Sequence, residues 1–512
     1  MKKTIILHPF LLALYPVLFL YSFNIHLLYP SVVVKPLIAT IICTFVLWLI
    51  TNLIVRNIAK SSALVSVFLL LFFSYKHYLL TFIGIFHKGV FTRDEVLFPL
   101  WLILCLVIFS LILKTKGELK NLTLFLNIIS VTLIAFPTTS IATYELTKRY
   151  PFSKREDLIK HFTKDSNNTK ISAKPNLPDI YYIIFDRYAN SNVLKEYFSY
   201  DNSEFINYLK DKGFYVATDS CTNYPKTYLS LASSLNLNYL DLVKEKIGTH
   251  LNDETVVYDL LRDYKVWRFL KSKGYKFVHL GGRWQPTEIN HFANLNFNSF
   301  IIDDFTIKLL KNTLLLRFMD KYINESQRNH IIYQLDKLGE LPSIKGPKFV
   351  FAHVLLPHEP FIFGPNGEDA KEKKYRKLSI QQKYLNQLTF ANKKIKILVD
   401  SLISKSNTPP IIVLQSDEGP YVHKDFNNGP QIYNWKGLST DALRVHMMIL
   451  NSYYLPGVDK SVLYNSITPV NSFRVIFNLY FDTDFPLLKD ESYIFEDSVH
   501  PYKFLNVTDV VR

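Results

Sequence analysis

Cysteine is scarce in this chain, with 3 among 512 residues. Cys43 and Cys105 fall within long apolar runs, which leaves Cys221 alone in the remaining sequence. A lone cysteine has no partner in the same part of the chain, so an internal disulfide is excluded there. That part must therefore be stabilised by its hydrophobic core. The chain also contains no internal repeat and no low-complexity tract, so no repeat architecture is expected.

A simple signal peptide is also missing. Such a peptide has one short apolar stretch before a small-residue cleavage site, whereas residues 1–141 contain several long apolar segments. Each is close to the ~20 residues that a helix needs to cross a bilayer. We therefore predict a five-helix transmembrane domain over residues 1–141. Its segments are roughly Ile5–Phe23, Val32–Val55, Ala63–Phe86, Leu97–Leu113 and Leu122–Ile141.

Positive charge is distributed unevenly around these segments. The side with more Lys and Arg faces the cytoplasm, so we expect a cytoplasmic N-terminus and an exported chain after Ile141. Residues 1–141 also carry more than half of the net charge of +15, and nothing in the charge calls for a nucleic-acid partner. One side carries Lys2, Lys3, Arg56, Lys60, Lys114, Lys116 and Lys120, and the other carries Lys35, Lys88 and Arg93.

The remaining sequence has a different pattern. Residues 142–177 are mostly polar and are predicted to form a juxtamembrane helix and a linker. From residue 178, short β-branched and aromatic runs end on polar residues, a pattern typical of strands covered on both faces. Because helical stretches alternate with these runs, residues 178–512 are predicted to form an α/β domain with a mainly parallel sheet. The runs are DIYYIIFDR, KFVHLGG, KFVFAHVLLPH, PPIIVLQSDEG and VHMMILNSYYL, and the helical stretches include Ser203–Lys212, Val256–Lys273 and Ile380–Ser404.

Carboxylates and imidazoles follow several of these predicted strands. Asp186 ends the first run, and Asp417 and Glu418 end the fourth. His353 and His358 lie in and after the third. Ligands bind beyond the carboxyl ends of strands in open α/β sheets, so we expect these groups at one edge. A single Asp at a strand end is usually a turn-former or helix cap, but several converging groups favour a shared site.

A lone threonine opens the helical stretch in NYPKTYLSLASSLN, residues 223–236. Tyr228, Leu231 and Leu235 share one helical face, which predicts Thr227 at the N-cap. Unpaired backbone N–H groups and the positive end of the helix dipole stabilise an oxyanion or a phosphate there. Thr227 is therefore either a helix cap only, or a nucleophile whose pKa a metal ion lowers.

Five motifs then suggest a family. With the apolar segments before them, they resemble the sulfatase-like branch of the alkaline phosphatase superfamily. The chain looks most like its membrane-anchored group, which includes lipoteichoic acid synthases and phosphoethanolamine transferases. This resemblance covers nearly the whole chain and implies an alkaline-phosphatase-like fold for the exported domain. The motifs are, in order, DIYYIIFDRYA, NYPKTYLSLASSLN, HVLLPHEPFIF, QSDEGP and TPVNSFRVIFNLYF.

The resemblance also implies roles for individual residues. Thr227 would be the nucleophile, and His353 and His358 would contact substrate oxygens or protonate the leaving group. Arg444 would contact the anion. Glu418 is either a ligand, a residue that supports a ligand, or a general base. The implied metal ligands are Asp186, Thr227, Asp417 and Glu418.

Two features depart from the patterns of related enzymes. Close relatives commonly have His where this chain has Glu418, and the resulting all-oxygen ligand set suits Mn²⁺, Mg²⁺ or Ca²⁺ better than Zn²⁺. Sulfatases proper carry a C/S-x-P-x-R motif. After Cys221 the proline is misplaced at Pro225 and the arginine is absent, which argues against formylglycine chemistry.

These observations predict a membrane-bound, metal-dependent enzyme of a bacterial inner membrane, with its catalytic domain in the periplasm or outside the cell. The resemblance implies a phospholipid donor, a phosphoethanolamine or phosphoglycerol headgroup, and an envelope glycan acceptor. One alternative is a hydrolase of phosphoric or sulfuric esters. Another is a catalytically silent envelope scaffold or sensor, which only Glu418 in place of His favours.

Overall fold

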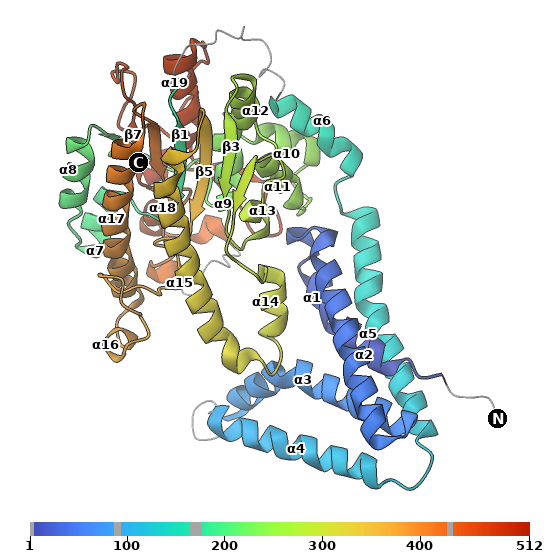
Figure 1. Cartoon of the computed structure of the whole chain (residues 1–512). Helices are drawn as coiled ribbons and strands as arrows, with labels where there is room; N and C mark the ends of the chain where they lie inside the picture. The colour runs from blue at the N-terminus through green and yellow to red at the C-terminus, as the bar shows by residue number, and fades with distance from the viewer. Residues whose placement is uncertain (1–4, 87–93, 164–176, 427–433) are drawn as a thin grey trace. The chain divides into compact units, whose positions relative to one another are not determined.

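The computed structural model describes residues 5–86, 94–163, 177–426 and 434–512 (Figure 1). The chain divides into two compact units. The first contains Met1–Arg149 and Ile302–Ile323, and the second contains Tyr150–Ile301 and Asn324–Arg512. Most of the predicted linker, residues 164–176, lies outside the described residues, so the predicted domain limits remain a prediction.

Apolar helices build the first unit. Four of those in the described residues are long and apolar enough to cross a membrane, which agrees with four of the five predicted spans. The helix α1 has 16 residues and is therefore only about 24 Å long, which is shorter than the ~30 Å hydrocarbon layer. Lys2, Lys3, Lys88 and Arg93 lie outside the described residues, and the predicted orientation remains a prediction. The helices are α1 (His8–Phe23), α2 (Val34–Val55), α3 (Ile58–Phe86), α4 (Asp94–Lys114) and α5 (Lys120–Thr147).

A seven-stranded sheet in the order β2-β7-β6-β1-β5-β3-β4 forms the second unit. The neighbours β6, β1, β5, β3 and β4 are parallel, whereas β7 pairs antiparallel with both β6 and β2. The predicted α/β fold with a mainly parallel sheet is therefore confirmed. The strands are β1 (Ile180–Phe185), β2 (Tyr215–Val216), β3 (Lys276–Leu280), β4 (Leu295–Phe297), β5 (Lys348–Val354), β6 (Ile411–Gln415) and β7 (Asn451–Tyr454), and β8 (Tyr493–Phe495) pairs with β9 (Phe504–Asn506) separately.

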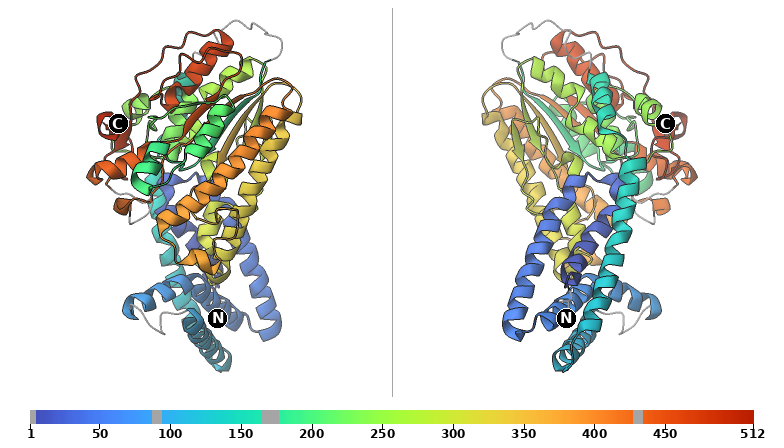
Figure 2. Two further views of the ribbon diagram at one scale, coloured as in Figure 1. Left: turned by 90° about the vertical axis from the view of Figure 1, so that its left-hand side faces the viewer. Right: turned by 90° about the vertical axis from the view of Figure 1, so that its right-hand side faces the viewer.

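Helices cover both faces of this sheet (Figure 2). Every residue of β1, β5 and β6 is buried, as the unbroken apolar runs predict. On one face the Tyr182 hydroxyl donates to Ser234 Oγ of α9, at 3.2 Å, and its ring packs edge-on against Phe473 of α19. The helices of this unit are α6 (Phe152–Thr163), α7 (Ser191–Phe198), α8 (Ser203–Asp211), α9 (Thr227–Asn236), α10 (Asp241–Ile247), α11 (Thr255–Arg262), α12 (Lys265–Ser272), α13 (Gln285–Glu288), α16 (Lys373–Arg376), α17 (Ile380–Lys405), α18 (Thr440–Met447), α19 (Pro469–Phe481) and α20 (Thr508–Val511), and α15 (Leu316–Glu340) runs from the first unit into this one.

Two predicted elements were wrong in detail. The run VHMMILNSYYL was expected to be a strand throughout, but its first residues end α18, whose N-cap Ser439 accepts a hydrogen bond from the backbone N–H of Ala442. The stretch 256–273 was expected to be one helix, but it forms α11 and α12. The chain between them is extended at Asp263, and Asn236 accepts the backbone N–H of Lys265. In both places side-chain hydrogen bonds fix a helix end that hydrophobic periodicity does not reveal.

Candidate active site at the carboxyl ends of the strands

Three adjacent parallel strands bring the predicted strand-end residues together. Asp186 directly follows β1, and its backbone N–H donates to the carbonyl of Val354 in β5 at 3.0 Å. His353 pairs in register with Ile184 of β1, and Asp417 lies two residues beyond β6. Because parallel strands end at the same edge of a sheet, these side chains share one site.

Asp186, His353 and Asp417 form a compact buried cluster. One donor atom from each lies within 4.8 Å of the others. His353 Nε2 is 3.2 Å from Asp186 Oδ2, and its Nδ1 is 3.3 Å from the Thr287 hydroxyl. The hydroxyl thus fixes the ring orientation, as hydrogen-bond partners of metal-bound histidines commonly do. The cluster has the residue types and proximity of a metal site.

Unpartnered carboxylate atoms support this interpretation. Asp186 Oδ1 and both carboxylate oxygens of Asp417 are buried without a hydrogen-bond partner among the described residues. A buried charged oxygen without a partner is costly, and a cation between the two carboxylates would satisfy all three atoms. The residues present therefore fit a divalent metal ion.

His353 changes the expected ligand chemistry. The sequence predicted it as a substrate contact, but its imidazole lies with Asp186 and Asp417 in the cluster. The donor set then includes nitrogen, so the all-oxygen premise that favoured Mn²⁺, Mg²⁺ or Ca²⁺ over Zn²⁺ no longer applies. A divalent metal remains the expectation, and its identity remains a prediction.

The two carboxylates have opposite electrostatic environments. Burial, followed by the negative charge of Asp186, raises the pKa of Asp417 to about 7. Burial would also raise the pKa of Asp186, but His358, His353 and Arg187 together hold that pKa well below its usual range. His353 also lowers the pKa of Asp417, but there burial and the charge of Asp186 outweigh it.

Thr227 is half-buried and lies beside this cluster. It is the first residue of α9, and the N-cap is Lys226, so the predicted N-cap position was one residue too late. The Thr227 hydroxyl is close enough to the Asp417 carboxylate to be among the groups that lower its pKa, although the geometry is not that of a formed hydrogen bond. The structure thus brings the predicted nucleophile to a predicted metal ligand.

Glu418 pairs with a basic residue, unlike the adjacent Asp417. Its Oε1 is 3.2 Å from Nε of Arg187, which also pairs with Glu359 and stacks 4.4 Å from the Tyr421 ring. Arg187 has φ 65°, a left-handed conformation that costs a non-glycine residue about 1 kcal/mol or more. Glu418 is not one of the three clustered residues, and its role as a ligand remains a prediction.

Two cations near the site were missed by the sequence analysis. Lys226 Nζ donates to the Tyr421 hydroxyl at 3.0 Å, next to the nucleophile in sequence. Arg187 follows Asp186 directly. A single basic residue beside a strand end or helix start carries no pattern that marks it, although the adjacency of Arg187 to Asp186 and of Lys226 to Thr227 was visible in the sequence. Together they add positive charge where an anionic substrate would bind.

The remaining predicted residues differ in position. His358 Nε2 is 3.9 Å from Asp186 Oδ2, and its side chain is partly exposed, so it borders the cluster on the solvent side. Arg444 Nη2 lies 3.6 Å from Glu196 of α7, where it forms an ion pair. Substrate contact by either residue remains a prediction.

Hydrogen bonds to backbone carbonyls fix the loop that carries Asp417. The Thr222 hydroxyl donates to the Asp417 carbonyl at 2.6 Å, and the Ser416 hydroxyl donates to the Glu418 carbonyl at 2.7 Å. The backbone N–H of Gly419 donates to the His446 carbonyl, also at 2.7 Å. The loop is thereby held against the chain at the end of α18.

Gly419→Ala is expected to displace this loop. A Cβ there would lie 2.4 Å from the Val445 carbonyl oxygen and 2.7 Å from that of His446, which backbone atoms cannot relieve cheaply. We expect a loss of about 1–3 kcal/mol in the free energy of unfolding and weaker metal binding, measured by thermal denaturation and metal titration. Gly282→Ala is the control, because its Cβ would meet only Leu355 Cδ1 at 3.9 Å. Equal stability of both variants would contradict this close packing.

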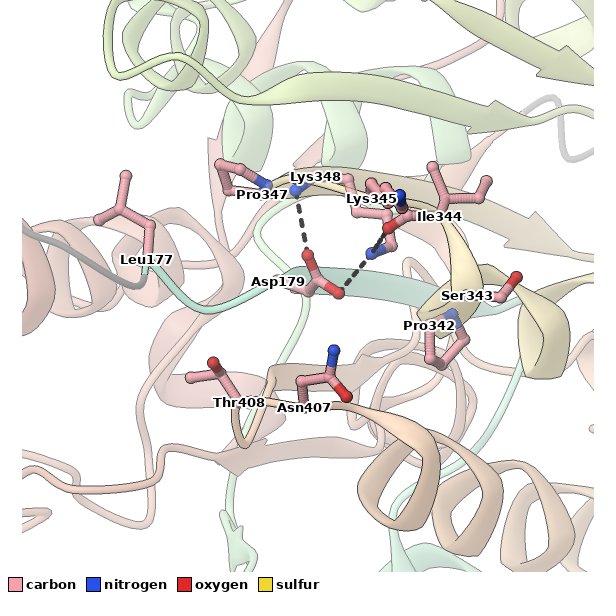
Figure 3. A pocket seen from close by; sticks show the side chains of 11 residues that line it. Leu177, Asp179, Pro342, Ser343, Ile344, Lys345, Pro347, Lys348, Asn407 and Thr408 are labelled. Carbon is pink, nitrogen blue, oxygen red and sulfur yellow. Dashed lines mark hydrogen bonds and ion pairs between the residues drawn. The ribbon is translucent and has the colours of Figure 1, made fainter.

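Two other features of the described residues are weaker candidates. A cavity of about 480 Å³ opens at the opposite edge of the sheet, where β1 and β5 begin (Figure 3). Two of its charged groups pair with each other, since Lys348 Nζ lies 2.5 Å from Asp179 Oδ2. Glu496, Asp497 and His500 form a second group of metal-ligand types, but they are only half-buried, and Asp497 already accepts hydrogen bonds from His500.

Comparison with known proteins gives structural similarities only. No family model and no curated protein sequence matches the chain. The C-terminal periplasmic domain of EcEptC from Escherichia coli is 12% identical, with a TM-score of 0.43, over 66% of this chain and 95% of that chain. The integral membrane phosphoethanolamine transferase EptA from Neisseria meningitidis is 13% identical, with a TM-score of 0.38, over 92% of this chain and 95% of that chain.

The similar structures also include the C-terminal periplasmic domain of phosphoethanolamine transferase EptC from Campylobacter jejuni. It is 10% identical, with a TM-score of 0.39, over 65% of this chain and 96% of that chain. Similarity at this level assigns no activity to the chain, so its function has to be inferred from the chemistry of the site.

Proposed function

We propose that the chain is a membrane-bound, metal-dependent transferase that moves a phospho-headgroup from a phospholipid to a cell-envelope glycan. The observation that carries this proposal is the position of Thr227 beside Asp417, which forms a buried cluster with Asp186 and His353. The unpartnered carboxylate oxygens of that cluster support a metal site and argue against a silent scaffold. Phosphoethanolamine and phosphoglycerol are the headgroups that the sequence resemblance suggests.

Asp186, His353 and Asp417 would hold the metal, with Glu418 as a further candidate. A bound divalent cation supplies positive charge that lowers the pKa of a neighbouring hydroxyl and polarises a phosphoryl group. The backbone N–H groups at the start of α9 and the charges of Lys226 and Arg187 would orient the phosphoryl oxygens. Thr227 is half-buried rather than enclosed, as a residue that meets a substrate must be.

The reaction then has two displacements. Thr227 Oγ1 gives its proton to solvent water and bonds to phosphorus, while the bond from phosphorus to the lipid ester oxygen breaks. His358, on the exposed side of the cluster, would donate a proton to that oxygen. A glycan hydroxyl next attacks phospho-Thr227, gives up its proton, and restores the threonine hydroxyl. Water in place of the glycan would make the same protein a hydrolase.

A membrane anchor suits this substrate, because attachment to the bilayer raises the effective concentration of the enzyme at its lipid donor. Under the proposed topology the N-terminus is cytoplasmic and the second unit lies outside a bacterial inner membrane. The four long apolar helices support attachment to a membrane, and the orientation rests on the uneven distribution of Lys and Arg around five predicted spans.

The proposal is tested with the full chain in detergent, phosphatidylethanolamine or phosphatidylglycerol labelled in the headgroup, and a purified envelope glycolipid. We expect metal-dependent transfer of label to the glycolipid. Release of label to water both with and without the glycolipid would identify a phosphodiester hydrolase instead. Cleavage of p-nitrophenyl sulfate alone would identify a sulfuric-ester hydrolase. No turnover of any substrate with Zn²⁺, Mn²⁺, Mg²⁺ or Ca²⁺ would favour a scaffold or sensor.

A further inference from the structure

A short segment of the catalytic sequence belongs to the membrane unit. After β4 the chain leaves the second unit, and Ile302–Ile323 is part of the first before the chain returns at Asn324. The segment contains helix α14 (Asp304–Leu310) and the beginning of α15. The chain therefore passes between the two units three times, rather than once through the linker that the sequence predicted.

Apolar contacts fix this segment to the membrane helices. Phe305 and Leu309 of α14 are each 4% exposed, in one cluster with Tyr21 of α1 and Tyr144 of α5. Further along, Leu314 packs against a second cluster, whose buried members are Tyr75 of α3 and Trp101 and Cys105 of α4. The backbone N–H of Leu314 donates to the carbonyl of Phe72 at 3.0 Å, and the Arg317 guanidinium stacks 4.1 Å from the ring of Phe98.

The segment contacts aromatic residues of the membrane helices, and these residue types indicate its depth in the bilayer. Tyr and Trp concentrate at membrane–water interfaces, where one end of the ring is apolar and the other is hydrated. Tyr21, Tyr75, Trp101 and Tyr144 come from four different helices, and the segment packs against all four. In α3 the apolar run gives way at this level to Ser-Tyr-Lys-His-Tyr, residues 74–78. These residue types are the ones expected at the headgroup layer of a membrane rather than in its hydrocarbon core.

One face of the segment is apolar and exposed. Leu315 is 38%, Phe318 is 66% and Tyr322 is 36% exposed, at the i, i+3 and i+7 spacing that puts them on one side of a helix. The exposed basic residues Arg317 and Lys321 border this face. Apolar residues flanked by Lys and Arg are typical of helices that lie in the membrane interface and attract anionic headgroups.

We propose that residues 302–323 form a lipid-binding element that attaches the catalytic sequence to the membrane–water interface. Leu315, Phe318 and Tyr322 enter the headgroup–acyl boundary, and Arg317 and Lys321 bind phosphate groups of anionic phospholipids. Packing against the membrane helices favours the bilayer over a protein partner for this face. The lipid contact of this element does not depend on the activity proposed above.

Site-directed fluorescence in the full chain tests this proposal. Single cysteines replace Leu315, Phe318, Asp320 or Tyr322 in a Cys43→Ser background, where Cys105 and Cys221 are buried. Each variant is labelled with a nitrobenzoxadiazole probe and reconstituted into vesicles that contain lipids with a nitroxide near the headgroup. Asp320 is the matched control, because its side chain is 72% exposed but lies on another face of the same helix. We expect quenching several-fold stronger at 315, 318 and 322 than at 320.

The contribution of Arg317 and Lys321 is tested separately. Adding phosphatidylglycerol to phosphatidylcholine vesicles should increase quenching at position 318, and Arg317→Gln with Lys321→Gln should abolish that increase. Equally weak quenching at all four positions would overturn the proposal. Weak quenching, together with spin–spin broadening when the cysteine at position 318 carries a nitroxide label instead, would assign the face to a second copy of the chain and overturn the proposal as well. Equally strong quenching at all four positions would contradict the proposed face.

Discussion

Thr227→Ala is expected to reduce metal-dependent cleavage of bis-p-nitrophenyl phosphate by roughly 10³-fold or more, since loss of a nucleophile removes the covalent route. The hydroxyl lies beside Asp417 at the start of α9. Thr227→Ser keeps the hydroxyl and should retain measurable activity. The three proteins are compared by their initial rates at saturating metal. Thermal denaturation checks that each variant is folded.

Thr440→Ala is the matched control for this experiment. Thr440 is also the first residue of a helix, α18, and is exposed, so both substitutions remove a hydroxyl from the same helical position. The control should keep full activity. If Thr227→Ala cleaves the substrate as fast as the unaltered chain, Thr227 is not the nucleophile and the two-displacement reaction is wrong.

Asp417→Asn should weaken divalent-metal binding by more than the roughly 10–100-fold that follows loss of a residue supporting a metal ligand. Asp417 is one of three clustered donors, and both of its oxygens are buried without a hydrogen-bond partner. An amide keeps an oxygen but loses the negative charge that attracts a divalent cation. Calorimetric titration of the metal-free protein with Zn²⁺, Mn²⁺ and Mg²⁺ measures this loss and also identifies the preferred ion.

The same substitution should leave the metal-free protein at least as stable as the unaltered chain. Two buried carboxylates repel each other when no cation lies between them, and Asn removes one charge. Asp497→Asn in the half-buried Glu496–Asp497–His500 group is the control, and it should not change metal affinity. If Asp497→Asn abolishes binding and Asp417→Asn does not, the metal belongs to that other group.

Local sequence patterns were sufficient for much of the fold. The unbroken apolar runs of β1, β5 and β6 are buried strands, because a strand covered on both faces needs apolar residues at successive positions. The helix Ile380–Lys405 agrees with its predicted range to one residue, since its Ser379 capping box is a local signal. The apolar length of four membrane helices is likewise visible without tertiary information.

The site was only partly visible in the sequence. Strand ends pointed to Asp186 and Asp417, and a polar side chain after an apolar run indicated each of them. His353 lies within an apolar run, where it could equally have been a core histidine. Its place in the cluster depends on the parallel pairing of β5 with β1, which joins residues 167 positions apart. The Arg187–Glu418 pair spans 231 positions and has no local signature.

Apolar periodicity and strand-end polar residues were enough to determine a membrane part, an α/β part and a set of candidate acidic and hydroxyl groups, because these signals depend on the nearest few residues. Only the tertiary structure decided that His353 joins the two aspartates, that Glu418 faces Arg187, and that residues 302–323 belong to the membrane unit. Those outcomes depend on strand register and on burial against distant helices, which no short stretch of sequence encodes.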